Sequence, residues 1–157
     1  MLGTASTPRN SRPHHASALL TYRSLSTNPK LKFLIIINPN SGPGAAPWWP
    51  NEDYVREIPR LNAFANVTIV GYVRATYCER PLSEVFEDID AYATRFREDK
   101  SGGLGVQGIF LDETVNLYSK KAKQYLDEID LKVKTTDGIT VDRLVSISLC
   151  VVTRPLH

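Results

Sequence analysis

The sharpest chemical signal in the sequence is the acidic pair Asp112-Glu113, which directly follows an apolar run over residues 108–111. Two carboxyl groups at the end of a buried strand are costly unless they are solvated, paired or used in chemistry, because like charges repel. Such a pair can supply the acid and the base or nucleophile of a reaction. The alternative is that these residues begin the next helix, where a carboxylate suits the N-terminal dipole. The residues alone leave both interpretations open.

Two other segments place polar and aromatic side chains after apolar runs. Asn38 opens the loop 38–44, whose proline and glycine content predicts a rigid, irregular loop. A phosphate-binding loop is disfavoured there, because the segment lacks Gly-Lys-Ser/Thr and no helix follows directly. Tyr72, Thr76 and Tyr77 lie at the end of the next apolar run. These tyrosines could stack against a sugar or pack beneath a loop, and the sequence does not decide between the two.

Short apolar runs and amphipathic segments must position these groups. Continuous apolar, β-branched runs are typical of strands covered on both faces in a parallel sheet. We expect strands at residues 33–37, 67–73 and 106–111, and a further strand could lie at 143–152.

Helical periodicity appears between the runs. Helices are predicted at residues 52–58, ending near Pro59, at 82–96 after Pro81, and at 116–129. The last of these has Tyr118, Ala122, Tyr125, Leu126 and Ile129 on one face. The alternation predicts a parallel α/β sheet, open or closed into a barrel, whose strands end at one common rim.

The remaining acidic runs lie on the predicted helices. We interpret them as solvated helix faces; they are Glu84, Glu87, Asp88 and Asp90 on one helix, and Asp127, Glu128 and Asp130 on another.

Composition narrows the class of protein. The chain is 42% hydrophobic and 23% charged, and its net charge of +2 does not suggest a nucleic-acid binder. No apolar run reaches the roughly 18 residues of a membrane span. No metal or cofactor motif is visible among three His and two Cys. Cys78 and Cys150 are expected to be free thiols, although a single disulfide stays open.

The first 30 residues differ from the rest of the chain. Residues 1–32 carry five basic and no acidic groups, which leaves 14 basic and 17 acidic groups in residues 33–157. The leader weakly resembles a mitochondrial transit peptide, but a disordered basic tail over residues 1–30 is favoured. No apolar core of a secretory signal is recognisable, so the localisation stays unknown.

Four segments together resemble one known family. They are INPNSGPG (residues 37–44), NEDYVREIPRLNAFAN (51–66), VGYVRATY (70–77) and GIFLDETVNLYS (108–119), and they resemble the spherulation-specific family 4, or spherulin 4-like, proteins of fungi and bacteria. The resemblance implies a (β/α)8 TIM-barrel fold, a secreted or cell-surface location, and kinship with glycoside hydrolases of α-1,4-linked galactosamine or N-acetylgalactosamine polymers.

The resemblance also implies a site. Asp112 and Glu113 match the family's acidic pair after the fourth barrel strand, which implies catalytic carboxyls, with the division of roles unassigned. Asn38, Tyr72, Thr76 and Tyr77 match positions on the same rim and are expected to contact the polysaccharide. No cofactor is implied, and the oligomeric state is open.

The chain departs from the family pattern in length. A complete barrel needs about 200 to 250 residues, whereas the match covers residues 28–145 of 157. We therefore expect a partial barrel over residues 31–145 that lacks the first and the C-terminal strands, followed by a divergent tail at 146–157. A later family carboxylate is also missing. The expectation is a glycosidase relative that is inactive in this form; the alternative is a non-catalytic surface or carbohydrate-binding protein.

Overall fold

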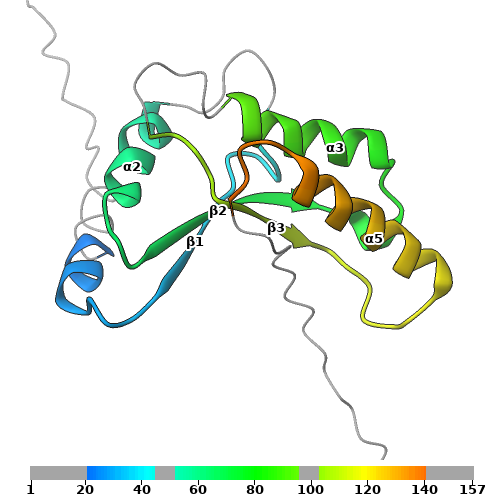
Figure 1. Ribbon diagram of the computed structural model, residues 1–157, viewed down its shortest axis with the longest axis horizontal. Coiled ribbons are helices and arrows are strands. Elements are labelled where there is room, and N and C mark those ends of the chain that lie inside the picture. The colour runs from blue at the N-terminus through cyan, green and yellow to red at the C-terminus, as the bar shows by residue number, and fades with distance from the viewer. Residues whose placement is uncertain (1–20, 45–51, 96–102, 141–157) are drawn as a thin grey trace, which may run out of the picture.

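The computed structural model describes residues 21–44, 52–95 and 103–140 (Figure 1). Strands and helices alternate along the chain, and β1, β2 and β3 form one parallel sheet in that order. This confirms the predicted parallel α/β arrangement. The strand considered at 143–152 lies outside the described residues. The elements are β1 (Phe33–Ile37), α2 (Glu52–Asn62), β2 (Val67–Arg74), α3 (Leu82–Asp90), β3 (Gly108–Asp112) and α5 (Lys120–Thr135).

The helices cover one face of the sheet. Alternate strand residues, including Ile69, Val73 and Leu111, are buried in one core with Ile58 of α2, and with side chains of α3 and α5. Figure 1 shows α3 and α5 running close together over this layer, where an ion pair of 2.7 Å joins Lys132 to Asp90. The strand residues that alternate with these buried core residues point to the opposite face of the sheet. On that face Leu34 and Ile36 are 44% and 40% exposed.

Helix α2 passes through Pro59, so the predicted helix end at that residue is wrong. A proline inside a helix removes one backbone hydrogen bond. The helix continues because residues on both sides of Pro59, Ile58 and Leu61, are buried in the core. Packing of this apolar face outweighs the local cost.

The two later helices also differ from their predicted bounds. The α-helical part of α3 ends at Asp90, and a π-helical turn, η2 (Ala91–Arg95), follows it. Helix α5 begins at Lys120 rather than 116, because the Ser119 side chain caps it by accepting a hydrogen bond from the Ala122 N–H at 3.0 Å. Tyr118 therefore precedes the helix and is 79% exposed, so its predicted place on one helix face with Ala122 and Tyr125 is wrong.

The leader is partly folded. Residues 21–27 are helical, and Leu25 is 2% exposed within the core. The disordered segment expected over residues 1–30 is therefore wrong for residues 21–30, while residues 1–20 lie outside the described part.

Three further observations apply to the described residues alone. No helix there is both long and apolar enough to cross a bilayer. No cluster of three or more His, Cys, Asp or Glu side chains is arranged to hold a metal. Cys78 is a buried free thiol, and Cys150 lies outside this part of the chain.

Candidate functional site

Tyr72 and Asp112 meet at the carboxyl end of the sheet. The register pairs Tyr72 with Phe110 and Arg74 with Asp112, so the side chains of Tyr72 and Asp112 lie on the same face. The Tyr72 hydroxyl donates a hydrogen bond to Asp112 Oδ2 at 2.8 Å. Burial, followed by this hydrogen bond, raises the pKa of Tyr72 to about 12. The phenol therefore stays protonated at neutral pH and remains a donor to Asp112.

The two side chains of the acidic pair differ in their hydrogen bonds within the described residues. Asp112 Oδ1 accepts a hydrogen bond from the Glu113 N–H at 2.7 Å, so both carboxylate oxygens of Asp112 have donors. Among the described residues, the Glu113 carboxylate has no hydrogen-bond partner. Because α5 begins only at Lys120, the pair does not start that helix. The interpretation of these carboxylates as helix-starting residues is wrong.

Thr76 and Tyr77 lie in a left-handed turn, η1 (Thr76–Cys78), after β2. The φ angles of Thr76, Tyr77 and Cys78 are 47°, 56° and 65°, and that of Glu113 is 54°. The Tyr77 N–H donates to the Glu113 carbonyl at 2.6 Å, so the turn is bonded to the loop that carries the acidic pair. The Tyr77 side chain is 64% exposed. A residue with an exposed aromatic ring is thus bonded through its backbone to the loop of the two carboxyl groups.

Asn38 lies on the same rim but organises a separate loop. Ile37 pairs with Gly71, which places Asn38 at the level of Tyr72 along the sheet. The Asn38 Oδ1 accepts a hydrogen bond from the Gly42 N–H at 3.1 Å, and its carbonyl accepts one from Tyr54. No described contact joins its side chain to Asp112. Of the six residues predicted from sequence, four therefore gather around Asp112, namely Tyr72, Thr76, Tyr77 and Glu113, and Asn38 stands apart.

Sequence reasoning missed the charged residues beneath this rim. Asp88 was interpreted as part of a solvated helix face, but its side chain is 19% exposed and pairs with Arg80 at 2.6 Å, so that interpretation is wrong. Tyr92, which is fully buried, donates to the carbonyl of Ile37 at the end of β1. A usable signal was present, because Glu84 and Asp88 follow Arg80 at intervals of four residues.

Comparison with known proteins places this rim in context. Spherulin-4 of Physarum polycephalum is 41% identical over 83 residues, which are 53% of this chain and 22% of that protein. The crystal structure of Aspergillus clavatus Sph3 in complex with GalNAc is 38% identical, with a TM-score of 0.77 over 83% of this chain and 52% of that one. The chain thus spans about half of the solved relative and less of the other.

The family assignment rests on a longer match. The model of spherulation-specific family 4 matches residues 16–153, which include all three strands of the sheet and the acidic pair. Together with both relatives, this match shows that the chain belongs to the spherulation-specific family 4.

Proposed function

We propose that the rim around Asp112 is a carbohydrate site of glycoside-hydrolase type, which binds galactosamine- or N-acetylgalactosamine-containing polymers. The observation that carries the proposal is the pairing at the end of β3 of two carboxyls: Asp112, which is fixed by two donors, and Glu113, whose carboxyl has no hydrogen-bond partner in the part of the chain that the structure describes. The similarity to Sph3, whose crystal structure contains GalNAc, supports the choice of sugar.

The two carboxyl groups suit different roles. Glycoside hydrolysis needs one carboxyl to protonate the departing oxygen and another that acts as carboxylate nucleophile or base. An ionised carboxylate can only accept hydrogen bonds, and both oxygens of Asp112 do so. We therefore assign the carboxylate role to Asp112 and the proton-donor role to Glu113, whose side chain is free to exchange a proton with a ligand.

Other rim residues would bind the sugar. The exposed ring of Tyr77 offers an apolar face for a sugar ring, and its hydroxyl is a polar handle. Thr76 precedes it in the same exposed turn, and Asn38 is exposed in the neighbouring loop. Tyr72 acts through its hydrogen bond to Asp112, which holds the carboxylate against the β2 end of the rim.

For residues 1–157 we propose binding without measurable hydrolysis. Hydrolysis requires both carboxyls to be held within about 0.5 Å of productive geometry by rigid surroundings. It also benefits from exclusion of water. In the described residues the face opposite the helices is partly open at β1, where Leu34 and Ile36 are each about two-fifths exposed, whereas Val70 and Phe110 on the same face are buried. This exposure at the edge of the sheet favours a carbohydrate-binding role over a hydrolytic one.

The test measures affinity and turnover separately. Calorimetric titration with α-1,4-linked galactosamine oligomers should give saturable binding, and Asp112→Asn or Glu113→Gln should weaken it by on the order of tenfold, the cost of a charged hydrogen bond. Asp137→Asn and Glu128→Gln, which change exposed carboxylates elsewhere, are the matched controls and should leave affinity unchanged. Release of reducing ends should stay at the level of the buffer.

Two outcomes would contradict this account. If the wild-type chain binds no oligomer, or if both rim variants bind as well as the controls, the site is wrong. If the chain releases reducing ends and loses that activity in Glu113→Gln, the site stands and the chain is an active hydrolase rather than a binding protein.

A further inference from the structure

We propose that Arg80 is a positioning residue, which holds the left-handed turn Thr76–Cys78 and so presents Tyr77 at the rim. Its predicted effect on glycan affinity rests on the proposed function, but its effect on the turn does not. Three successive residues with side chains have left-handed φ angles in this turn. Such a conformation persists only where its surroundings hold it.

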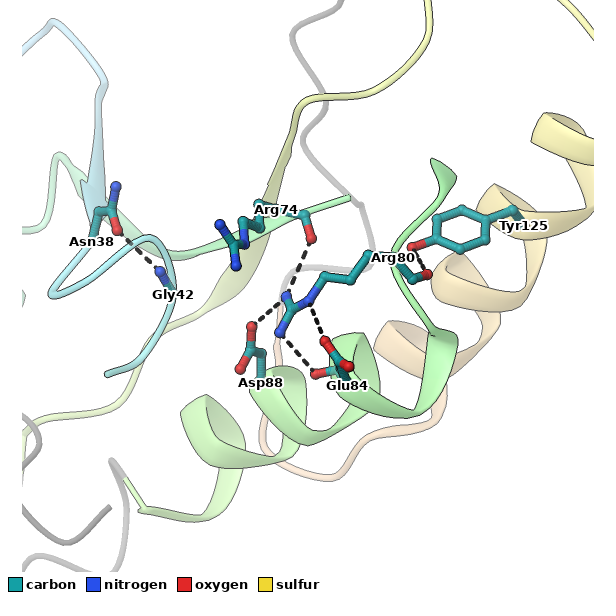
Figure 2. A network of polar contacts seen from close by, with 7 residues as sticks. All are labelled: Asn38, Gly42, Arg74, Arg80, Glu84, Asp88 and Tyr125. Atoms are coloured by element: carbon teal, nitrogen blue, oxygen red, sulfur yellow. Dashed lines mark hydrogen bonds and ion pairs between the residues drawn. The ribbon is translucent and has the colours of Figure 1, made fainter. Parts of the chain in front are cut away.

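The guanidinium of Arg80 ties the strand before the turn to the helix after it (Figure 2). Its Nη1 lies 2.6 Å from Asp88 Oδ2 and 3.3 Å from the carbonyl oxygen of Arg74, the last residue of β2. Its Nε donates to Glu84 Oε2 at 3.3 Å. The side chains of Arg80 and Asp88 are 13% and 19% exposed, so this ion pair is largely shielded from solvent, whereas Glu84 is 55% exposed. One side chain therefore bonds to both ends of the segment that contains the turn.

The backbone of Arg80 closes the same segment. Its N–H donates to the carbonyl of Ala75 at 3.3 Å, directly across the three left-handed residues. Its carbonyl accepts a hydrogen bond from the Tyr125 hydroxyl of α5 at 2.8 Å. Figure 2 shows Tyr125 reaching Arg80 from the side opposite to Asp88. The residue after the turn is thus held by β2, α3 and α5 together.

The Arg80–Asp88 pair also supports the loop after β1. A Cβ atom on Gly42 would lie 3.1 Å from Asp88 Oδ2, so this loop packs closely against the carboxylate. The Gly42 N–H in turn donates to the Asn38 side chain. The ion pair therefore lies between the loop that carries Asn38 and the turn that carries Tyr77, the two segments proposed to contact sugar.

An arginine suits this position better than another cation. The planar guanidinium directs several donors along fixed directions, whereas a lysine ammonium is a point charge on a flexible stem. Here the acceptors are two carboxylates and two backbone carbonyls, those of Arg74 and Glu84. A lysine would keep the charge but could not make these contacts at once.

Cys78 provides a direct readout of the turn. It is the last residue of the turn and is 4% exposed, so a thiol reagent reaches it only when the turn opens. Substitution Cys150→Ser leaves Cys78 as the sole thiol. In this background we would measure the rate of thiol modification and the affinity for galactosamine oligomers in Arg80→Lys, Arg80→Gln and the control Lys134→Gln, which removes an exposed cation paired with Asp130.

We expect both Arg80 variants to modify Cys78 faster and to bind oligomer more weakly, each by on the order of tenfold, the size expected for losing a charge-assisted hydrogen bond. Lys134→Gln should change neither quantity. Global unfolding would also expose the thiol. Gly103→Ala, which destabilises the amino-terminal end of the sheet, therefore serves as a second control, and each variant is compared with it at the same number of degrees below its own melting temperature. It should leave Cys78 more protected than the Arg80 variants do.

The outcomes separate the two proposals. If Arg80→Lys keeps Cys78 protected, charge alone suffices and the positioning role is wrong; the same holds if Arg80→Gln matches Gly103→Ala. If Cys78 responds as expected while the unsubstituted chain binds no oligomer, the positioning role stands and the proposed function fails. If Arg80→Gln does not fold, Arg80→Lys and Asp88→Asn carry the same comparison.

Discussion

The loops at the two ends of the sheet place positive φ angles on different types of residue. At the amino-terminal end, the described residues with left-handed φ angles are glycines, Gly103 and Gly138. At the carboxyl end, Gly42 and Gly44 also have positive φ angles, but so do residues with side chains; they are Ser41, Thr76, Tyr77, Cys78 and Glu113. Each of the three strands is followed by at least one of them.

The difference means that the carboxyl end of the sheet carries backbone strain that the amino-terminal end avoids. Left-handed backbone costs a residue with a side chain roughly 1–2 kcal/mol, and glycine avoids that cost. Strain of this kind gathers where side chains must be presented to a ligand. The rim therefore gives up stability to hold Tyr77 and Glu113 in place, while the amino-terminal end does not.

The largest expected effect concerns the packed layer that supports both ends. A Cβ atom on Gly71 would lie 2.6 to 2.7 Å from ring atoms of Tyr92, which is fully buried. Gly71→Ala should therefore lower the free energy of unfolding by about 3 kcal/mol, as overpacking does. Urea denaturation measures it, with Gly105→Ala as the control, since a Cβ there meets no atom within 4 Å. Equal losses in both variants would contradict the close packing of Gly71 on Tyr92.

A smaller loss is expected at the amino-terminal end. Gly103 has a φ of 138°, and a Cβ there would lie 3.3 Å from the Cβ of Pro59. Gly103→Ala should lower the free energy of unfolding by about 1–2 kcal/mol, because alanine resists this conformation. Glycan affinity should not change. An unchanged denaturation midpoint would show that glycine is not needed at this position, and would contradict the claim that the amino-terminal end avoids strain by using glycine.

The opposite sign is expected at the rim. Thr76 has a φ of 47° and is exposed, so glycine would relieve its strain at the cost of extra chain entropy. Thr76→Gly should raise the free energy of unfolding by about 0.5–1 kcal/mol while weakening glycan binding. Thermal melts and calorimetric titration check the two parts. A destabilised Thr76→Gly variant would show that the turn is not strained.

The smallest effect concerns the dependence of stability on pH. Tyr72, Tyr22 and Tyr125 have pKa values raised to about 12, chiefly by burial, whereas tyrosine in an unfolded chain ionises near pH 10. Between about pH 10 and 12 the unfolded state has thus lost protons that the folded state retains. The contribution of these tyrosines to stability should be constant below pH 10 and fall from pH 10 towards 12.

Tyr72→Phe isolates the contribution of the rim. It should make the alkaline loss of stability less steep and lower the free energy of unfolding at pH 7 by about 0.5 kcal/mol, since Asp112 loses a donor. Denaturation midpoints measured from pH 8 to 11 give both quantities. An identical alkaline slope in wild type and Tyr72→Phe would show that this phenol is not held protonated by the rim.

The sequence predicts the sheet well because its signals are local. Continuous apolar runs marked all three strands within two residues of their bounds, and the end of β3 marked Asp112. Tertiary packing decided the features that were missed. Helix α2 continues past Pro59 because Leu61 is buried, and the left-handed turn involves Thr, Tyr and Cys, residue types that do not favour it. Its support by Arg80 depends on contacts with α3 and α5.

The central claim is that ligand binding belongs to the strained rim and not to the amino-terminal end. Titration of the isotopically labelled chain with GalNAc, followed by amide chemical shifts, tests it most directly. The account predicts saturable shifts at residues 72–80 and 112–114, with residues 103–108 unchanged. Shifts centred on residues 103–108, or no saturable shift at any GalNAc concentration, would contradict it.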